Sequence, residues 1–359
     1  MTYSAAVPGN DFAAIPLDEL PPPTVVEQLD FEQLRKQIID RLSGSQPLLF
    51  DQYKQPVFLE AELVTSDNGE QYFKVPATEL GALLYLDRES HPFVRWANTT
   101  AYWTMTQQQR FQQRSLSVFL QYAQDADLEG LGALLNVKRL MIDAGDPQAT
   151  PPVPPTYESN QSFRRRIQLK PEAITTAGSR GSYIYHSLSA DPTVKDAMVD
   201  RPVFQRSGND IVLDYDAGLS APQYGDVAIT VLSSVGNGEA SKALLDTVAT
   251  ALDDEKVRPG NDRPRTRSAQ IMEYAIEVEL AMYDGPDKAV VIAEAEKRLQ
   301  AYADQMHRIG SSVRHAKIDH AAGLAGVENV NIISPAADIL VNNRQAAYCT
   351  GITVREASV

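Results

Sequence analysis

A dense run of prolines places the strongest constraint on how this chain folds. Five of the nine residues from Pro147 to Pro155 are proline. Proline fixes the backbone φ angle and has no N–H to donate, so neither a helix nor a central strand continues through such a segment. The chain of 359 residues is also longer than one hydrophobic core usually holds. We therefore predict an N-terminal domain at residues 1–146, a proline-rich linker at 147–158, and further domains beyond it.

The N-terminal domain begins with an amphipathic helix. Apolar side chains recur at helical spacing from residue 31 to 42, and Asp30 followed by Gln33 makes a capping box at the start. Leu34 and Ile38 lie one turn apart on the apolar face. A helix that cannot cover its own apolar face is expected to find partner helices, so both residues are candidate interface residues.

A second and longer helix starts at His91-Pro92, because proline is tolerated in the first turn of a helix. Its apolar residues include Phe93 and Trp96 near the start, and the pattern continues to Leu120. We predict that Phe93 and Trp96 also contribute to an interface with partner helices.

A short β-hairpin is predicted between these helices, at about residues 57–75. Two stretches rich in apolar and β-branched residues flank Asn68-Gly69, a pair that fits the positive φ angles of a tight turn. The N-terminal domain is therefore expected to be a mainly helical arm with a small hairpin inserted into it.

Beyond the prolines, strands and helices alternate, which indicates two tandem α/β sandwich modules and an α+β chain overall. The middle domain covers residues 159–268 and contains an insertion at about 202–223, and the C-terminal domain covers 269–359. The two modules share a weak internal repeat. In the first, a predicted helix is followed by Val194 and DVAITVL, and in the second, a predicted helix is followed by Val327 and YCTGITV. We expect helices at 160–168, 178–189, 240–253, 287–306 and 313–324, strands at VKDAMV, DVAITVLSS, QIMEYAIEVELAMYDG, VENVNII and AAYCTGITV, and a hairpin at RSGND.

The charge balance argues against nucleic acid as a partner. The chain has 33 Lys and Arg against 47 Asp and Glu, a formal charge of -14, which repels a phosphate backbone. Its first residues lack the positive and apolar regions of a signal peptide, and no apolar run approaches the roughly 20 residues of a membrane span. We expect no nucleic-acid binding, no export and no membrane insertion.

The best metal candidate is RHAKIDH, in which His315 and Asp319 at i, i+4 share one helix face. His320 points elsewhere, and the chain has no His-Glu-x-x-His pattern and only 5 histidines. A polar, exposed helix face is therefore the preferred interpretation, and we predict no metal site.

Glycines at Gly236 and Gly238 follow a strand and precede a helix, the local geometry that offers backbone N–H groups to an anion. Ser241 stands where a dinucleotide motif needs its third glycine, so a plain turn is the preferred interpretation. The single cysteine, Cys349, has no basic neighbour and is read as a strand residue. With no Gly-x-Ser-x-Gly elbow either, we predict no catalytic residue and no cofactor.

The densest basic run is Arg164, Arg165 and Arg166 at the start of the middle domain. Arginine pairs well with phosphate, but a short run at the start of a domain is more typical of salt bridges at an interface or of solvated side chains. We predict an interface role for the three arginines.

A long, ordered set of motifs resembles the baseplate J-like proteins of contractile phage tails. The principal one is SNQSFRRRIQLKPEAITTAGSRGSYIYHSLSADPTVKDAMV, residues 159–199. The resemblance covers most of the chain, although the 57–75 hairpin and the 202–223 insertion are longer than the usual pattern of the family. The other motifs, in order along the chain, are LPPPTVVEQLDFE, LQYAQDADLEGLGALLNVKRL, VRPGNDRPRTRSA, SPAADI and QAAYCTGITV.

This resemblance implies a structural wedge subunit of the tail baseplate, in a virion assembled in the host cytoplasm. It implies N-terminal helices that pack with a second copy and a smaller wedge protein, and C-terminal modules that join wedges into a ring around the hub. Further expected partners are the sheath-initiator baseplate protein, the central hub or spike, and tail fibre proteins. The ring is expected to change diameter on contraction, with rigid domains moving about the proline linker.

Two other interpretations stay open at this point. The same subunit could serve a tail-derived bacteriocin or an injection machine, which the presence or absence of capsid genes nearby would decide. More remotely, the chain could be an α/β enzyme that uses the Gly236–Gly238 turn as an anion or nucleotide site, and a purified monomer would then bind phosphate.

Overall fold

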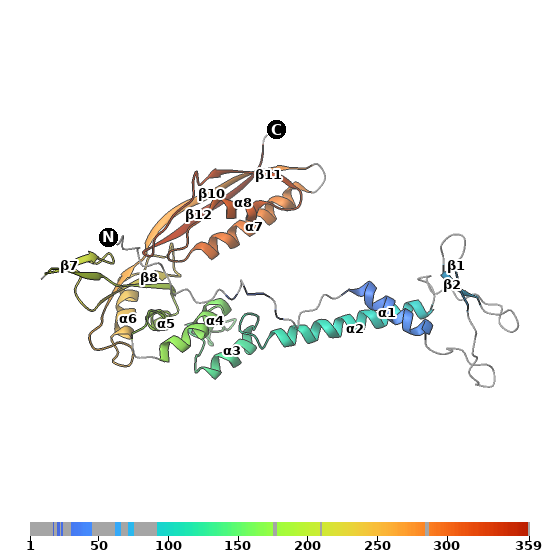
Figure 1. Cartoon of the computed structure of the whole chain (residues 1–359), viewed down its shortest axis with the longest axis horizontal. Coiled ribbons are helices and arrows are strands. Elements are labelled where there is room, and N and C mark those ends of the chain that lie inside the picture. Colours follow the sequence, from blue (N-terminus) through green and yellow to red (C-terminus); the bar gives the residue numbers. More distant parts are fainter. Residues whose placement is uncertain are drawn as a thin grey trace. The chain divides into compact units, whose positions relative to one another are not determined.

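A computed structural model of the chain shows an α+β protein (Figure 1). The structure describes residues 17, 20, 21, 23, 30–44, 62–65, 71–74, 92–174, 178–208, 210–283 and 287–357. The chain divides into two compact units, Asp18–Asp127 and Met1–Leu17 with Leu128–Val359.

The first unit contains two helices that pack on each other, α1 (Phe31–Gly44) and α2 (Pro92–Leu116). The predicted cap of α1 is present, since a carboxylate oxygen of Asp30 accepts hydrogen bonds from the backbone N–H of Glu32 (2.9 Å) and Gln33 (3.2 Å). Helix α2 begins at Pro92 as expected but ends at Leu116, four residues before the predicted end. The next residues form turns, in which Phe119 N–H donates to the Leu116 carbonyl.

The predicted hairpin is also present in this unit. Strands β1 (Glu62–Thr65) and β2 (Gln71–Lys74) pair antiparallel. Residues 66–70, which include the predicted Asn68-Gly69 turn, lie outside the described residues.

The second unit starts with α3 (Asp125–Leu134), most of which belongs to it, and a small sheet of β3 (Met141–Asp143) and β4 (Thr156–Tyr157). The prolines lie in the loop between these strands, where Asp146 and Val153 pair as an isolated bridge. The segment is thus a closed loop within this unit. The predicted role of residues 147–158 as a linker between domains stays a prediction.

A three-stranded sheet of order β5-β8-β9 forms the middle of this unit. Its central strand is fully buried and pairs antiparallel with β5 and parallel with β9. The helices begin with side-chain caps, for example Ser159, Ser179 and Ser241. The elements are α4 (Asn160–Leu169), the 3-10 turn at Lys170–Ile174, α5 (Arg180–Ala190), β5 (Val194–Asp200), β6 (Val203–Ser207), β7 (Asp210–Tyr215), β8 (Asp226–Ser233), α6 (Lys242–Leu252) and β9 (Arg263–Ser268).

A second three-stranded sheet, of order β11-β10-β12, forms the C-terminal part (Figure 1). Strand β10 (Gln270–Met282) is central, and β11 (Val327–Ser334) and β12 (Gln345–Glu356) flank it. Helices α7 (Lys288–Met306) and α8 (His315–Ala322) bury side chains in one apolar core with this sheet.

The sequence similarity predicted between the two modules is not matched by their strand pairing. Strands β5 and β8 are hydrogen-bonded neighbours, whereas β10 lies between β11 and β12. The two sheets meet in a cluster that contains Met198, Leu232 and Ile309. Only Ala269 separates β9 from β10, and its N–H donates to the Val231 carbonyl (2.8 Å).

Candidate assembly interface

Helix α2 has two sides of opposite character. Its buried side consists of small residues, Val94, Ala97 and Ala101, each 0% exposed. Its other side carries Trp96, Trp103 and Phe111, which are 54%, 60% and 66% exposed. Successive members are seven and eight residues apart, about two helical turns, so they share one side of the helix. We call these three residues the aromatic face of α2.

An aromatic side chain contributes roughly 150–250 Å² of surface, so the aromatic face leaves a few hundred Å² of apolar surface in solvent. Exposed patches of that size on soluble proteins mark interaction sites. The exposure of Trp96 fits the predicted interface, but Trp103 and Phe111 were not singled out from the sequence. Their spacing from Trp96 was the signal that could have found them.

The other helical candidates are less informative. Leu34 and Ile38 are partly buried on α1, and the side chain of Phe93 lies outside the described residues. Their interface role stays a prediction.

The arginine run on α4 makes ion pairs within the chain. Arg166 is 5% exposed and pairs with the buried carboxylate of Glu158, and its guanidinium also donates to the Lys138 carbonyl (3.1 Å). Arg165 donates to a carboxylate oxygen of Asp196 on β5 (2.6 Å). Burial, and then the nearby Arg139, lower the pKa of Arg164. The interface role of the three arginines stays a prediction, while two of them already hold α4 to neighbouring elements.

Arg139 is a further residue of this cluster that sequence reasoning missed. Its guanidinium donates to Glu129 (2.6 Å), to the Glu158 carbonyl (2.7 Å) and to the side chain of Asn160 (2.7 Å). It also lies 4.6 Å from the centre of the Phe163 ring. Arg139 therefore fixes the β3–β4 region against α4.

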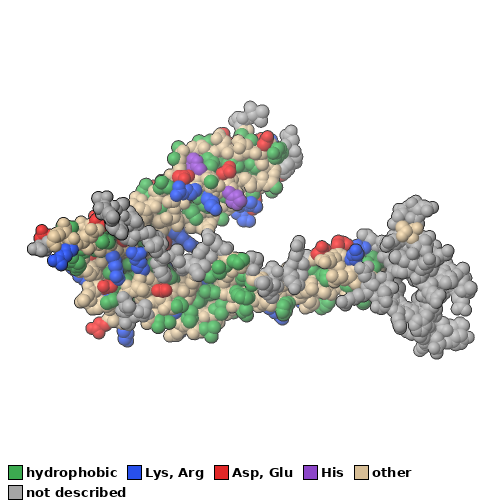
Figure 2. Space-filling model, viewed as in Figure 1, with side chains coloured by type: hydrophobic (Ala, Val, Ile, Leu, Met, Phe, Trp, Pro, Cys, Tyr) green, Lys and Arg blue, Asp and Glu red, His purple; other side chains and the backbone are tan. Residues whose placement is uncertain are grey.

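A second apolar surface surrounds β3 and β4. Figure 2 shows hydrophobic side chains gathered over the part of the chain that holds α3 and α4. Leu134 is 80% exposed, and β3 and β4 present further large side chains to solvent. The exposed members of this surface are Leu134, Leu135, Met141, Ile142, Val153 and Tyr157.

The predicted insertion at 202–223 contains the hairpin of β6 and β7, whose apolar residues Ile211 and Leu213 are exposed. Two arginines hold its base. Arg267 on β9 donates to the carbonyl oxygens of Ala217 (2.7 Å) and Gly218 (3.0 Å), and Arg344 donates to the Tyr215 hydroxyl (3.3 Å). The hydrogen bonds of Arg267 on β9 and of Arg344, just before β12, thus attach the hairpin to both sheets.

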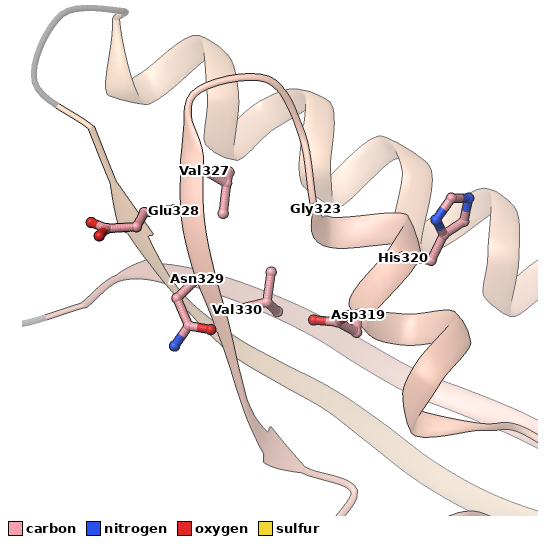
Figure 3. A pocket seen from close by; sticks show the side chains of 7 residues that line it. All are labelled: Asp319, His320, Gly323, Val327, Glu328, Asn329 and Val330. Carbon is pink, nitrogen blue, oxygen red and sulfur yellow. The ribbon is translucent and has the colours of Figure 1, made fainter.

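The predicted metal candidates do not converge. The Pro335 carbonyl accepts a hydrogen bond from His315 Nε2 (2.6 Å), so this ring nitrogen is bound within the chain. Asp319 and His320 line a surface pocket of about 340 Å³ between α8 and β11, in which His320 points away from Asp319 (Figure 3). Within the described residues, no three His, Cys, Asp or Glu side chains are grouped as a metal ion requires.

Two backbone N–H groups of the glycine turn donate to acceptors within the chain. Gly236 and Gly238 have φ angles of 65° and 103°, which explains the glycines. The N–H of Gly238 donates to the Val235 carbonyl (3.3 Å), and the N–H of Glu239 donates to the side chain of Asn237 (3.1 Å). These groups are therefore not presented to an anion.

Cys349 is a partly buried residue of β12, as the sequence indicated, and burial raises the pKa of its thiol. None of the described helices has the length and apolar character needed to cross a membrane.

The described surface carries two exposed apolar regions, the aromatic face of α2 and the surface around β3 and β4, and comparisons with known proteins give the family of the chain. Residues 89–146 match the model of the Baseplate J-like N-terminal domain, and residues 274–355 match that of the Baseplate J-like protein C-terminal domain. The chain is 35% identical to "Baseplate protein J" of Escherichia phage P2 over 336 residues, which covers 94% of this chain and 95% of that protein. The chain belongs to the baseplate J-like family.

Among solved structures, a chain of the anti-feeding prophage baseplate is similar at 12% identity, with a TM-score of 0.35. The match covers 55% of this chain and 44% of that chain.

Proposed function

We propose that this chain is a structural wedge subunit of a contractile phage tail baseplate, located in the virion. Its family membership supports a structural role in a phage baseplate. The wedge assignment rests on the aromatic face of α2, because a helix with one buried side and one exposed aromatic side needs a further helix to cover it.

In this proposal, the N-terminal helices pack with a second copy and a smaller wedge protein. The C-terminal modules join neighbouring wedges into a ring around the central hub and contact the sheath-initiator protein. The apolar surface around β3 and β4 and the β6–β7 hairpin supply additional contact surfaces for that ring.

The subunit does its work by holding neighbours and changing position, so we propose that it is not an enzyme. The closed glycine turn and the dispersed His315, Asp319 and His320 side chains support this. We further propose that the proline segment allows a change of angle when the tail contracts. Wedge structures before and after contraction test this hinge, and an unchanged angle would rule it out.

Co-expression with the neighbouring small wedge protein tests the assembly role. We expect a stable complex by size-exclusion chromatography and electron microscopy, and we expect the double variant W96S/W103S to lose it. The matched control is Tyr283→Ser, which removes a ring that is 55% exposed on the C-terminal module. A monodisperse monomer with the wild-type chain, or a complex that survives the double variant, would refute the proposal.

A further inference from the structure

The contact between the two sheets is built around a buried histidine. His307 follows the last turn of α7 and is 8% exposed. Its Nδ1 lies 2.8 Å from Nζ of Lys195 on β5, and its ring meets the edge of Tyr348 on β12 with ring centres 5.2 Å apart. Two strands from distant parts of the chain, β5 and β12, thus contact one imidazole.

The contact with Lys195 favours one tautomer of this ring. A lysine ammonium can only donate a hydrogen bond, so Nδ1 of His307 accepts and the proton of the neutral ring is on Nε2. Nε2 is buried without a well-formed hydrogen bond, facing the backbone of Asn237. On the same side Gly238 closes the space, since a Cβ on it would lie 2.7 Å from Nε2. A second proton would place an N–H donor against the Lys195 ammonium.

The charged surroundings favour the neutral ring. Burial lowers the pKa of His307 and the cation of Lys195 lowers it further, while the Asn237 backbone, Asp304 and Asp196 raise it. Burial also lowers the pKa of Lys195, which Asp304 and Asp196 raise and Arg308 lowers. The net direction is downward for both groups, so the pair resists carrying two positive charges.

The loop that begins with His307 is attached to β5 at a second point. A carboxylate oxygen of Asp196 accepts a hydrogen bond from the buried N–H of Ile309 (3.0 Å), and the other oxygen accepts from Arg165 (2.6 Å). The Ile309 side chain lies in the apolar cluster between the sheets. Displacing His307 from Lys195 would therefore pull Ile309 away from Asp196.

We propose that the Lys195–His307 contact makes the junction between the two sheets acid-sensitive. Neutral His307 holds the loop after α7 against β5. Protonated His307 repels the Lys195 ammonium, releases the loop and loosens Ile309 from Asp196, while each sheet keeps its own strand pairing.

The change of stability with pH follows from the linkage between proton binding and folding. The pKa of His307 is lower in the folded chain than in the unfolded chain, so the unfolded chain binds this proton first as the pH falls. The contribution of the contact to stability is complete above the ordinary histidine pKa of about 6.5. It declines as the pH falls from there toward the folded-state pKa.

Nuclear magnetic resonance of the full chain with ¹⁵N-labelled histidine tests the proposal directly. We expect His307, assigned by its loss in His307→Asn, to carry its proton on Nε2 and to titrate below about 6.5. Lys195→Met should move this midpoint upward, whereas Lys297→Met, which alters a lysine 81% exposed on α7, should not. A proton on Nδ1, an ordinary midpoint, or no response to Lys195→Met would overturn the proposal.

Urea unfolding from pH 7.5 to 4.5 gives the second measurement. Asparagine places an amide oxygen near the position of Nδ1 and does not titrate, so His307→Asn should lose part of the wild-type decline in stability. His320→Asn, at an exposed site on α8, is the matched control and should keep the wild-type slope. Equal slopes for wild type and His307→Asn would contradict the proposal. If His307→Asn does not fold, the urea unfolding of Lys195→Met decides without any assignment: losing the cation that lowers the pKa of His307 should also flatten the decline, and an unchanged slope would overturn the proposal.

Discussion

The guanidinium of Arg166 and the carboxylate of Glu158 form an ion pair in which the side chains are only 6% and 4% exposed. The same carboxylate oxygen accepts a hydrogen bond from the N–H of Leu140 (2.9 Å). The pair therefore connects α4, the end of β4 and the start of β3, and it holds both ends of the proline-containing loop.

Removing one member of this pair is expected to destabilise the protein strongly. Glu158→Gln leaves the Arg166 cation buried without its counter-ion, which costs about 3–5 kcal/mol of unfolding free energy. Glu129 pairs with Arg139, and its side chain is 47% exposed. Glu129→Gln should therefore lower the unfolding free energy by less than about 1 kcal/mol. Urea unfolding of both variants checks this, and equal losses would show that burial of the Glu158 pair is unimportant.

Two glycines of α3 should respond to alanine in opposite directions. A Cβ on Gly132 would lie 2.6 Å from Cζ of Phe163, so Gly132→Ala should destabilise the chain by about 1–3 kcal/mol. A Cβ on Gly130 would meet nothing within 4 Å, and Gly130→Ala should stabilise it by about 0.5–1 kcal/mol. Thermal unfolding distinguishes them, and a stabilising Gly132→Ala would mean that α3 does not pack on α4 as described.

The attachment of the β6–β7 hairpin by Arg267 and Arg344 can also be tested with glycine-to-alanine variants. Gly208 and Gly218 have φ angles of 63° and 70°, so alanine at either site costs about 1–2 kcal/mol of backbone strain. A Cβ on Gly218 would also lie 2.8 Å from the Arg267 guanidinium, whereas one on Gly208 would be in open space. Gly218→Ala should therefore be the more destabilising variant by denaturant unfolding. Equal effects would show that the arginines do not clamp the hairpin.

The loop before β12 should weaken in strong acid. The carboxylate of Asp338 accepts hydrogen bonds from the Arg314 guanidinium (2.8 Å) and the His315 N–H (2.9 Å), which lower its pKa. Stability from this carboxylate is present above the unfolded-state pKa of about 3.9 and is lost as the pH falls through the lower folded-state pKa. Asp338→Asn should reduce this acid-dependent loss in urea unfolding, and an unchanged pH profile would exclude the contribution.

Local signals predicted most of the secondary structure. The cap at Asp30 and the proline at Pro92 placed the starts of α1 and α2, and Asp287 caps α7 where that helix was expected. Strand β9 was missed because its sequence, RPRTRS, contains a proline and three arginines. It is stable as an edge strand because Asp226, buried on the neighbouring strand, pairs with Arg265 (3.1 Å).

The candidate sites were harder to predict because they depend on contacts between distant residues. Arg165 pairs with Asp196, which lies 31 residues later, and the surroundings of His307 depend on Lys195, 112 residues earlier. Neither partner is identifiable from spacing. By contrast, the start of α2 at Pro92 was predicted from the sequence, because it requires only a local signal, whereas the interface role of Trp96 stays a prediction.

The single residue between β9 and β10 has a mechanical consequence. Because only Ala269 separates the two strands, a force along the axis of β10 is transmitted directly to β9. The parallel hydrogen bonds from Asp226–Arg263 to Val231–Ser268 would then bear the load in shear, so many bonds share the force at once. Tension applied to the C-terminal sheet is therefore carried into the middle sheet as displacement of the whole strand, and it is not absorbed by stretching a flexible connection.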